Sequence, residues 1–109
     1  MTEILNNTLV VHIAKEVDHH NASIIREEVE YVFKKNNLKN IIFDFSKVNF
    51  IDSSGIGMCI GRYKLAKSIG GDFAACSLTS ETCRIFDMAG LSKLIKIYDD
   101  VNSALENLS

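Results

Sequence analysis

The spacing of apolar residues in the first third of the chain predicts two strands and a helix. Leu9, Val11 and Ile13 occupy alternate positions, which indicates a strand over residues 9–14 with one strongly buried face. Residues 2–5 are expected to pair with it through a polar turn. Between residues 22 and 35 apolar side chains recur at helical spacing and predict an amphipathic helix that ends at two asparagines: Ile25, Val29, Val32 and Phe33.

The middle of the chain continues this alternation. Residues 41–45 form a near-continuous apolar run, typical of a central strand covered on both faces. A second helical pattern follows and ends at Gly70-Gly71, with Ile56, Cys59, Ile60 and Tyr63 on its apolar face. Residues 73–76 are predicted to form another short buried strand.

The last third predicts two more helices and one strand. Thr79 or Ser80 is expected to cap a helix that closes at Gly90. Residues 94–98 fit a strand, and Asp99 or Asp100 is expected to start a terminal helix. The pattern as a whole predicts one α/β domain over residues 1–109, with a mixed, mostly parallel sheet of about five strands and about four helices.

Composition narrows the class of protein. The 109 residues are 47% hydrophobic and 24% charged, with a formal net charge of −2, and Lys and Arg are spread along the chain, which argues against nucleic acid as a partner. We expect a cytoplasmic protein without a membrane partner, because we find neither a secretion signal nor an apolar run long enough to span a bilayer. The three cysteines lack the spacing of a metal or redox motif, so we expect buried, reduced thiols and no metal or other cofactor.

The strongest chemical signal is Asp52-Ser53-Ser54-Gly55, at the expected start of a helix. Free N–H groups and the helix dipole favour an anion at such a terminus, including a phosphate attached to one of the hydroxyls. Simple capping is the alternative, because Asp and Ser are ordinary N-cap residues.

Other readings of this segment fit less well. A nucleophile elbow needs glycine two positions to either side of the serine, and neither Ser53 nor Ser54 meets that requirement. We therefore expect no catalysis, although a small serine hydrolase stays an alternative. The glycines at 55, 57 and 61 match no phosphate-binding loop. Gly57 and Gly61 share one helical face and are expected to allow close approach to the sheet or to a partner.

Asp18-His19-His20 precedes the first helix and invites a metal-site interpretation. Adjacent side chains on a helix diverge, and no fourth ligand is suggested by spacing, so a loop with an N-cap is favoured. Loops at the carboxyl ends of parallel strands gather on one edge of the sheet. Asp18 and Ser53 could therefore be neighbours.

Several segments together resemble the STAS-domain anti-sigma factor antagonists, most closely those of the sporulation anti-sigma F pathway. The resemblance covers nearly the whole chain and rests on residues 17–20, 50–57, 61–64, 69–71 and 84–91. Lys15 departs from the family pattern, which usually has glycine there.

The resemblance implies a STAS-like fold and a regulated binding module. A member of this family binds a partner that is both anti-sigma factor and serine kinase, and so releases the sigma factor. The kinase would phosphorylate Ser53, which ends binding, and a PP2C-type serine phosphatase would restore it. By position, Asp52, Ser54, Gly55, Ile56 and Gly57 would form the acceptor loop and partner surface. Asp18 and His19 would border that surface.

Two points stay open within this reading. The first is the partner: the chain could instead be a general-stress antagonist, or another STAS regulatory module such as that of a transporter or sensory complex, and would then bind a different partner. Arg62, Tyr63 and Lys64 are candidate kinase contacts, and ordinary helix packing and solvation is their alternative role.

Overall fold

A five-stranded sheet organises the chain, and its strand order follows the sequence. The computed structural model describes residues 1–108; Ser109, the last residue of the expected domain, lies outside them. The strand order is β1 (Thr2–Leu5), β2 (Thr8–His12), β4 (Asn40–Asp44), β6 (Phe73–Cys76) and β7 (Lys96–Tyr98). β1 runs antiparallel to β2 and the other pairs are parallel. The predicted mixed, mostly parallel sheet is confirmed.

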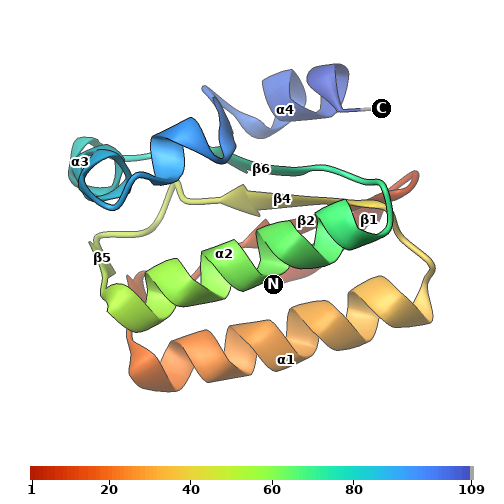
Figure 1. Ribbon diagram of the computed structural model, residues 1–109, viewed down its shortest axis with the longest axis horizontal. Helices are drawn as coiled ribbons and strands as arrows, with labels where there is room; N and C mark the ends of the chain where they lie inside the picture. Colours follow the sequence, from red (N-terminus) through yellow and green to blue (C-terminus); the bar gives the residue numbers. More distant parts are fainter. Residues whose placement is uncertain (109) are drawn as a thin grey trace.

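Three helical connections contribute side chains to the main core on one face of this sheet. α1 (His19–Lys35), α2 (Ser53–Ser68) and α3 (Ser80–Met88) each connect one strand to the next, and the 3-10 turn η1 (Leu91–Lys93) follows α3. Because parallel crossovers are right-handed, successive steps in one direction place their helices on the same face. Figure 1 shows α1 and α2 below the sheet and α4 (Val101–Asn107) above it.

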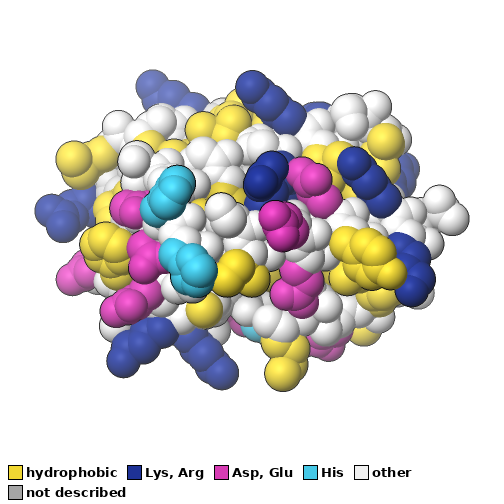
Figure 2. All heavy atoms as spheres, turned by 90° about the horizontal axis from the view of Figure 1, so that it is seen from below, with side chains coloured by type: hydrophobic (Ala, Val, Ile, Leu, Met, Phe, Trp, Pro, Cys, Tyr) yellow, Lys and Arg dark blue, Asp and Glu magenta, His cyan; other side chains and the backbone are white. Residues whose placement is uncertain are grey.

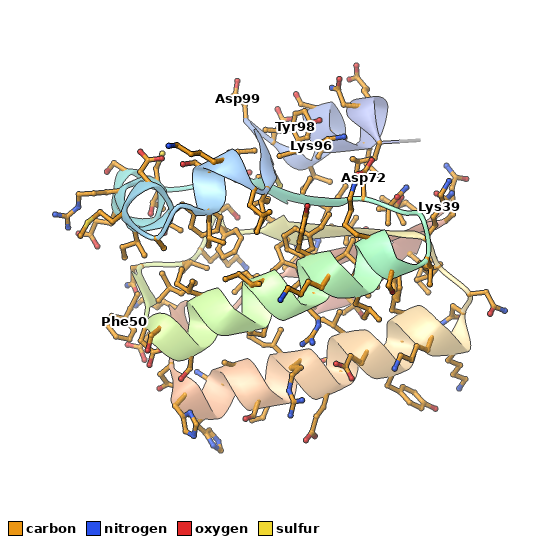
Figure 3. The ribbon with its side chains drawn as sticks, in the orientation of Figure 1. Lys39, Phe50, Asp72, Lys96, Tyr98 and Asp99 are labelled. Atoms are coloured by element: carbon orange, nitrogen blue, oxygen red, sulfur yellow. The ribbon has the colours of Figure 1, made fainter. Side chains whose placement is uncertain are left out.

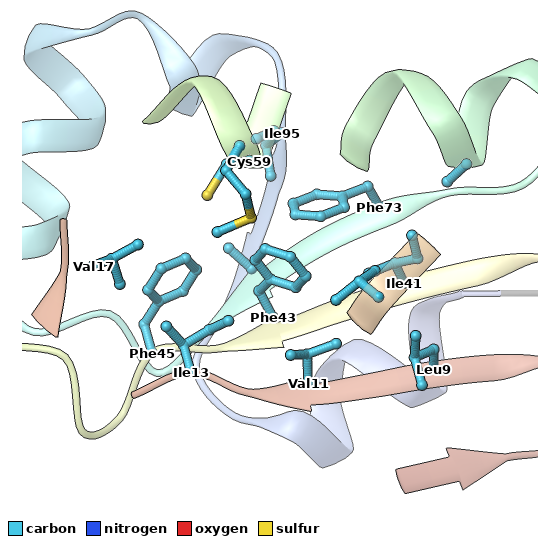
Figure 4. Close-up of a cluster of buried hydrophobic side chains, with 14 of the residues drawn as sticks. Leu9, Val11, Ile13, Val17, Ile41, Phe43, Phe45, Cys59, Phe73 and Ile95 are labelled. Atoms are coloured by element: carbon cyan, nitrogen blue, oxygen red, sulfur yellow. The ribbon is translucent and has the colours of Figure 1, made fainter. Parts of the chain in front are cut away.

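Each inner strand is buried on both faces. Phe43 and Phe73 point into the main core beneath the sheet, where their ring centroids lie 4.9 Å apart (Figure 4). Ile42 and Ala74 point the other way, into a small cluster covered by α4 through Ala104. β2 follows the same rule, since Val10 is as buried as Leu9. The expectation of one buried face for this strand was therefore too narrow.

Several boundaries agree with the sequence patterns. Thr79 caps α3, Asp100 caps α4, and Gly90 has the left-handed φ of 77° that glycine adopts without strain. α1 begins at His19, three residues before the expected start. Two short strands, β3 (Glu16–Val17) and β5 (Phe50–Ile51), were not predicted, and they form a separate parallel pair.

α2 packs with a different face from the one expected. Its buried residues are Gly55, Met58, Cys59, Arg62 and Ala66. Ile56, Ile60 and Tyr63 are only partly buried at the margin of the main core. The expected face was wrong in part because α2 packs against both the sheet and α1. The spacing of apolar residues did not predict that the side toward α1 would also be buried.

Candidate functional site

The two-residue pair of β3 and β5 brings the starts of α1 and α2 together. Val17 aligns with Ile51, so the next residues, Asp18 and Asp52, leave the pair side by side. The Asp52 N–H donates to the carbonyl oxygen of Val17 at 3.1 Å. The expected neighbourhood of Asp18 and the serine segment is thus realised by backbone pairing of the strands just before them.

Both aspartates cap the helix that follows. Asp52 Oδ1 accepts hydrogen bonds from the N–H groups of Ser54 (2.9 Å) and Gly55 (3.1 Å). Asp18 Oδ1 accepts one from the N–H of Asn21 at 2.9 Å. These bonds satisfy helix-end donors that would otherwise need water.

The two serines of the segment face different surroundings. Ser53 is the first residue of α2, and its side chain is exposed. Ser54 is half-buried, and its Oγ lies 3.2 Å from Nδ1 of His19 on α1. An enzyme approaching from solvent therefore meets the hydroxyl of Ser53 first.

Gly55 occupies a position where any side chain would crowd its neighbours. A Cβ atom there would lie 2.6 Å from Cγ1 of Ile51 and 2.8 Å from Cγ1 of Val17. Gly55 therefore allows the first turn of α2 to pack directly on the β3–β5 pair. Ile56 is half-buried beside it, and Gly57 is exposed.

Gly57 and Gly61 differ from the expectation of close approach to the sheet. A Cβ atom at either position would meet nothing within 4 Å. The expectation that these glycines let α2 approach the sheet is wrong, because this side of α2 faces open space. A role in partner approach stays a prediction.

The serine segment contains a serine–histidine contact, but its histidine has no carboxylate partner among residues 1–108. Among residues 1–108, His19 hydrogen-bonds to Ser54 but to no carboxylate that would orient its ring. His12 is engaged elsewhere, with Nε2 2.5 Å from Oε2 of Glu3 and Nδ1 2.7 Å from Oδ2 of Asp44. The described residues therefore place a serine beside a histidine without the third group of a catalytic triad.

Arg62 is the main surprise on α2. Its side chain is 7% exposed, and Nη2 pairs with Oε1 of Glu30 on α1 at 2.9 Å. Of the two roles considered for Arg62, kinase contact and ordinary helix packing, its burial against α1 agrees with helix packing, but the sequence did not indicate a buried ion pair with Glu30. Of its neighbours, Tyr63 is half-buried and Lys64 is exposed.

Two further sequence expectations can be compared with the structure. Cys59 and Cys76 are buried, but Cys83 is exposed on α3, so the expectation of three buried thiols was wrong for Cys83. Lys15 is not among the residues with positive φ, so its backbone does not require the glycine that the family usually has there.

An apolar side chain stands beside the serine segment. Phe50 on β5 is 51% exposed and lies at the end of the molecule where α1 and α2 begin (Figure 3). Asp72, Lys96 and Lys39 lie toward the opposite end in the same view. Large exposed aromatic residues are frequent anchors of protein interfaces, and sequence reasoning did not single out Phe50.

Residues 1–108 were compared with the requirements of a metal site and of a membrane-spanning helix. In residues 1–108, no group of three or more His, Cys, Asp or Glu side chains converges as a metal site would require. Of the helices in that part of the chain, none has the length and apolar character needed to cross a membrane.

Comparisons of the sequence with protein families and with individual proteins agree with each other. Residues 1–104 match the STAS domain family. The chain is 35% identical over 100 residues to an anti-sigma F factor antagonist of Paenibacillus polymyxa, covering 92% of this chain and 86% of that protein. It is 32% identical over 91 residues to the anti-sigma-B factor antagonist of Bacillus subtilis, covering 84% and 82%.

A solved structure shows the same fold. The anti-sigma factor antagonist SpoIIAA in its unphosphorylated form superposes with a TM-score of 0.85 at 23% identity, over 97% of this chain and 92% of that one. The sequence match over nearly the whole chain and the shared sheet and helix arrangement agree. The chain therefore belongs to the STAS domain family.

Proposed function

We propose that this protein is an anti-sigma factor antagonist whose binding is switched off by phosphorylation of Ser53. The observation that carries the proposal is the contrast between the two serines at the start of α2. Ser53 is exposed, whereas Ser54 is half-buried against His19. The two relatives above, both antagonists of anti-sigma factors, support the same class of function.

The partner in this proposal is an anti-sigma factor that is also a serine kinase. It would dock over the β3–β5 end of the molecule, where Asp18 and His19 lie beside the serine segment. Phe50, half exposed next to the segment, would supply apolar contact area. A PP2C-type phosphatase would remove the phosphate and restore binding.

Electrostatics would make the switch effective. A phosphate adds about −1.5 to −2 charges at neutral pH, which is close to the whole formal charge of −2. Left unpaired in an interface, such a charge can cost about 2 to 5 kcal/mol, or roughly 30-fold to several-thousand-fold in affinity.

The helix would not need to rearrange to accept this charge. Asp52 already accepts from the N–H groups of Ser54 and Gly55, so a phosphate on Ser53 would point outward instead of replacing the cap. We therefore expect the backbone of α2 to stay in place, with the effect confined to the partner surface. The protein itself would catalyse nothing.

Intact-mass spectrometry with peptide mapping tests the proposal. The chain is incubated with the candidate anti-sigma kinase and ATP as wild type, Ser53→Ala and the neighbouring control Ser54→Ala. One phosphate on wild type and Ser54→Ala, and none on Ser53→Ala, would support Ser53 as acceptor. Phosphate uptake by wild type and Ser53→Ala but not by Ser54→Ala would move the acceptor to Ser54, and no uptake by any form would contradict this kinase.

Two pathways compete as the setting for this function. We propose the sporulation sigma F pathway first, and the 32% identity to an anti-sigma-B factor antagonist favours a general-stress pathway as the second candidate. Pull-down of the unphosphorylated chain with each of the two anti-sigma kinases separates them. Retention by only the sigma B partner would reject the sporulation assignment while leaving the antagonist function in place.

A further inference from the structure

A cavity of about 260 Å³ opens between the first halves of α1 and α2. Its walls come from two helical stripes, one on each helix, and include His19, Ser23, Arg26, Ser54, Gly57 and Arg62. The face of α1 that Figure 2 displays carries charges of both signs, with histidine side chains gathered near one end. The chemistry of this cavity therefore depends on the few side chains that line it and not on a broad charged surface.

Arg62 lines this cavity with unused hydrogen-bonding capacity. Its Nη2 pairs with Glu30, but Nε and Nη1 are buried and have no hydrogen-bond partner among residues 1–108. Buried donors without an acceptor are unfavourable, so native structures generally supply one. Arg62 is among the residues that line the cavity, so an acceptor bound there would lie beside its guanidinium group.

The charges around the cavity favour an anion as that acceptor. Burial lowers the pKa of Arg62, and repulsion from nearby Arg26 acts in the same direction, against the attraction of Glu30. Two guanidinium groups thus face one carboxylate. A water molecule could accept a hydrogen bond but would leave this excess of positive charge unbalanced.

Gly57 keeps the cavity open. A Cβ atom at this position would meet nothing within 4 Å, so the space above the helix backbone is empty of protein. The hydroxyl of Ser54, four residues before Met58 and eight before Arg62, lies along the same side of α2. A small ligand could therefore contact Ser54 and the guanidinium groups from one position.

We propose that the cavity between α1 and α2 binds an oxyanion, the carboxylate or phosphate group of a ligand, through Arg62 and Arg26. Ser54 and His19 border the site and would add hydrogen bonds. The site is separate from phosphorylation of Ser53 and requires no kinase. A small anion, or an acidic side chain of a binding partner, would bind there against the helix face beside the serine segment.

Titration of the ¹⁵N-labelled full chain with inorganic phosphate tests this site, with sodium chloride holding the ionic strength constant. We expect saturable shifts of the Arg62 Nε–H signal and of the Ser54 and Gly57 amides. Arg26→Gln removes one charged donor and should weaken binding roughly tenfold. The matched control Arg84→Gln, an exposed arginine on α3 outside the cavity, should bind phosphate like wild type.

A second pair of variants tests the cavity without altering charge. Gly57→Leu fills the open space and should abolish the saturable shifts, whereas Gly61→Leu adds the same side chain outside the lining of the cavity and should retain them. Unsaturable shifts, shifts centred on other residues, or equal binding by Gly57→Leu and Gly61→Leu would overturn the proposal.

Acetate in place of phosphate distinguishes the source of the oxyanion. Tighter binding of phosphate would indicate a phosphoryl ligand, and comparable binding of acetate would indicate a carboxylate such as an acidic side chain. Both results support the oxyanion site, and binding of neither would reject it. Because no kinase is present, these outcomes are independent of the test of Ser53.

Discussion

The N–H of Asp52 donates to the carbonyl oxygen of Val17 at 3.1 Å, which ties the start of α2 to the strand that leads into α1. Two segments more than thirty residues apart in sequence thereby present their helix caps on one surface. The exposed hydroxyl of Ser53 belongs to that surface. Changes that loosen this junction should affect stability, and changes at Ser53 should affect only partner binding.

Substitution of Ser53 should separate phosphorylation from binding. Ser53→Ala should bind the anti-sigma kinase like the unphosphorylated wild type, because the exposed hydroxyl contributes little to the fold. Ser53→Asp should weaken binding by about tenfold, less than a phosphate does, since one carboxylate carries less charge. Isothermal titration calorimetry with the anti-sigma kinase measures both; wild-type affinity for Ser53→Asp would argue against a charge-based switch.

Removal of the α2 cap should destabilise the fold. Asp52→Ala leaves the N–H groups of Ser54 and Gly55 without their acceptor and should lower the free energy of unfolding by about 0.5 to 2 kcal/mol. Asp52→Asn keeps an oxygen at the cap and is the control, with a much smaller loss. Urea denaturation followed by circular dichroism gives both values, and equal losses would assign the effect to charge instead of capping.

Two glycines of the same helix should respond in opposite directions to alanine. Gly55→Ala places a Cβ atom against Ile51 and Val17 and should cost about 1 to 3 kcal/mol of stability. Gly57→Ala meets open space and should stabilise α2 by up to about 1 kcal/mol. Thermal or urea unfolding checks the pair; similar stability of the two variants would contradict the close packing at Gly55.

The hydrogen bonds of His12 should make stability depend on pH. The bonds to Glu3 and then to Asp44 raise the pKa of His12 above 6.5 in the folded protein. A group whose pKa is raised by folding stabilises the fold below its unfolded pKa, so this contribution should be lost as pH rises from 6.5 through the folded value.

Asp44 should make stability depend on pH in the acidic range. Its burial raises the pKa, but hydrogen bonds from Ser46 and His12 outweigh burial and hold it below 3.8. Its contribution should be present above 3.8 and lost as pH falls through the lowered value. The free energy of unfolding of wild type and His12→Gln, measured across the pH range, tests both contributions. The variant should lack the loss of stability above pH 6.5. An unchanged alkaline slope in His12→Gln would contradict it.

The three thiols should react in two classes. Burial raises the pKa of Cys59 to about 12 and that of Cys76 to about 11, so both stay protonated and shielded. Cys83 is exposed. Alkylation of the native protein at mildly alkaline pH should add one group, on Cys83, and unfolding should expose all three. Rapid labelling of Cys83→Ser would show that a buried thiol is accessible.

Much of the fold follows from sequence patterns because its long elements carry strong periodicity. The apolar run 41–45 and the helical spacing of Val29 and Phe33 mark segments whose burial the structure confirms. β3 and β5 span two residues each, too few for any period to emerge. Yet this pair decides where Asp18 and Asp52 lie, so only their general neighbourhood could be expected from the sequence.

The burial of Arg62 could not be predicted for a different reason. Its partner Glu30 lies on another helix, and only the packing of α1 on α2 brings the two together. A charged residue within a helix pattern ordinarily indicates the solvated side. The cavity that Arg62 lines could therefore not be predicted, whereas the residue types of Asp52-Ser53-Ser54-Gly55 were enough to mark that segment as a candidate site.

The order of strands in the sheet has a consequence for how the chain acquires its structure. Since β1, β2, β4, β6 and β7 pair in the order of synthesis, each new strand can be added at a free edge, and none has to be inserted between strands already paired. Emergence from the ribosome therefore presents the segments in an order that allows stepwise growth. α4, the last helix, then covers the face of the sheet that α1, α2 and α3 leave open.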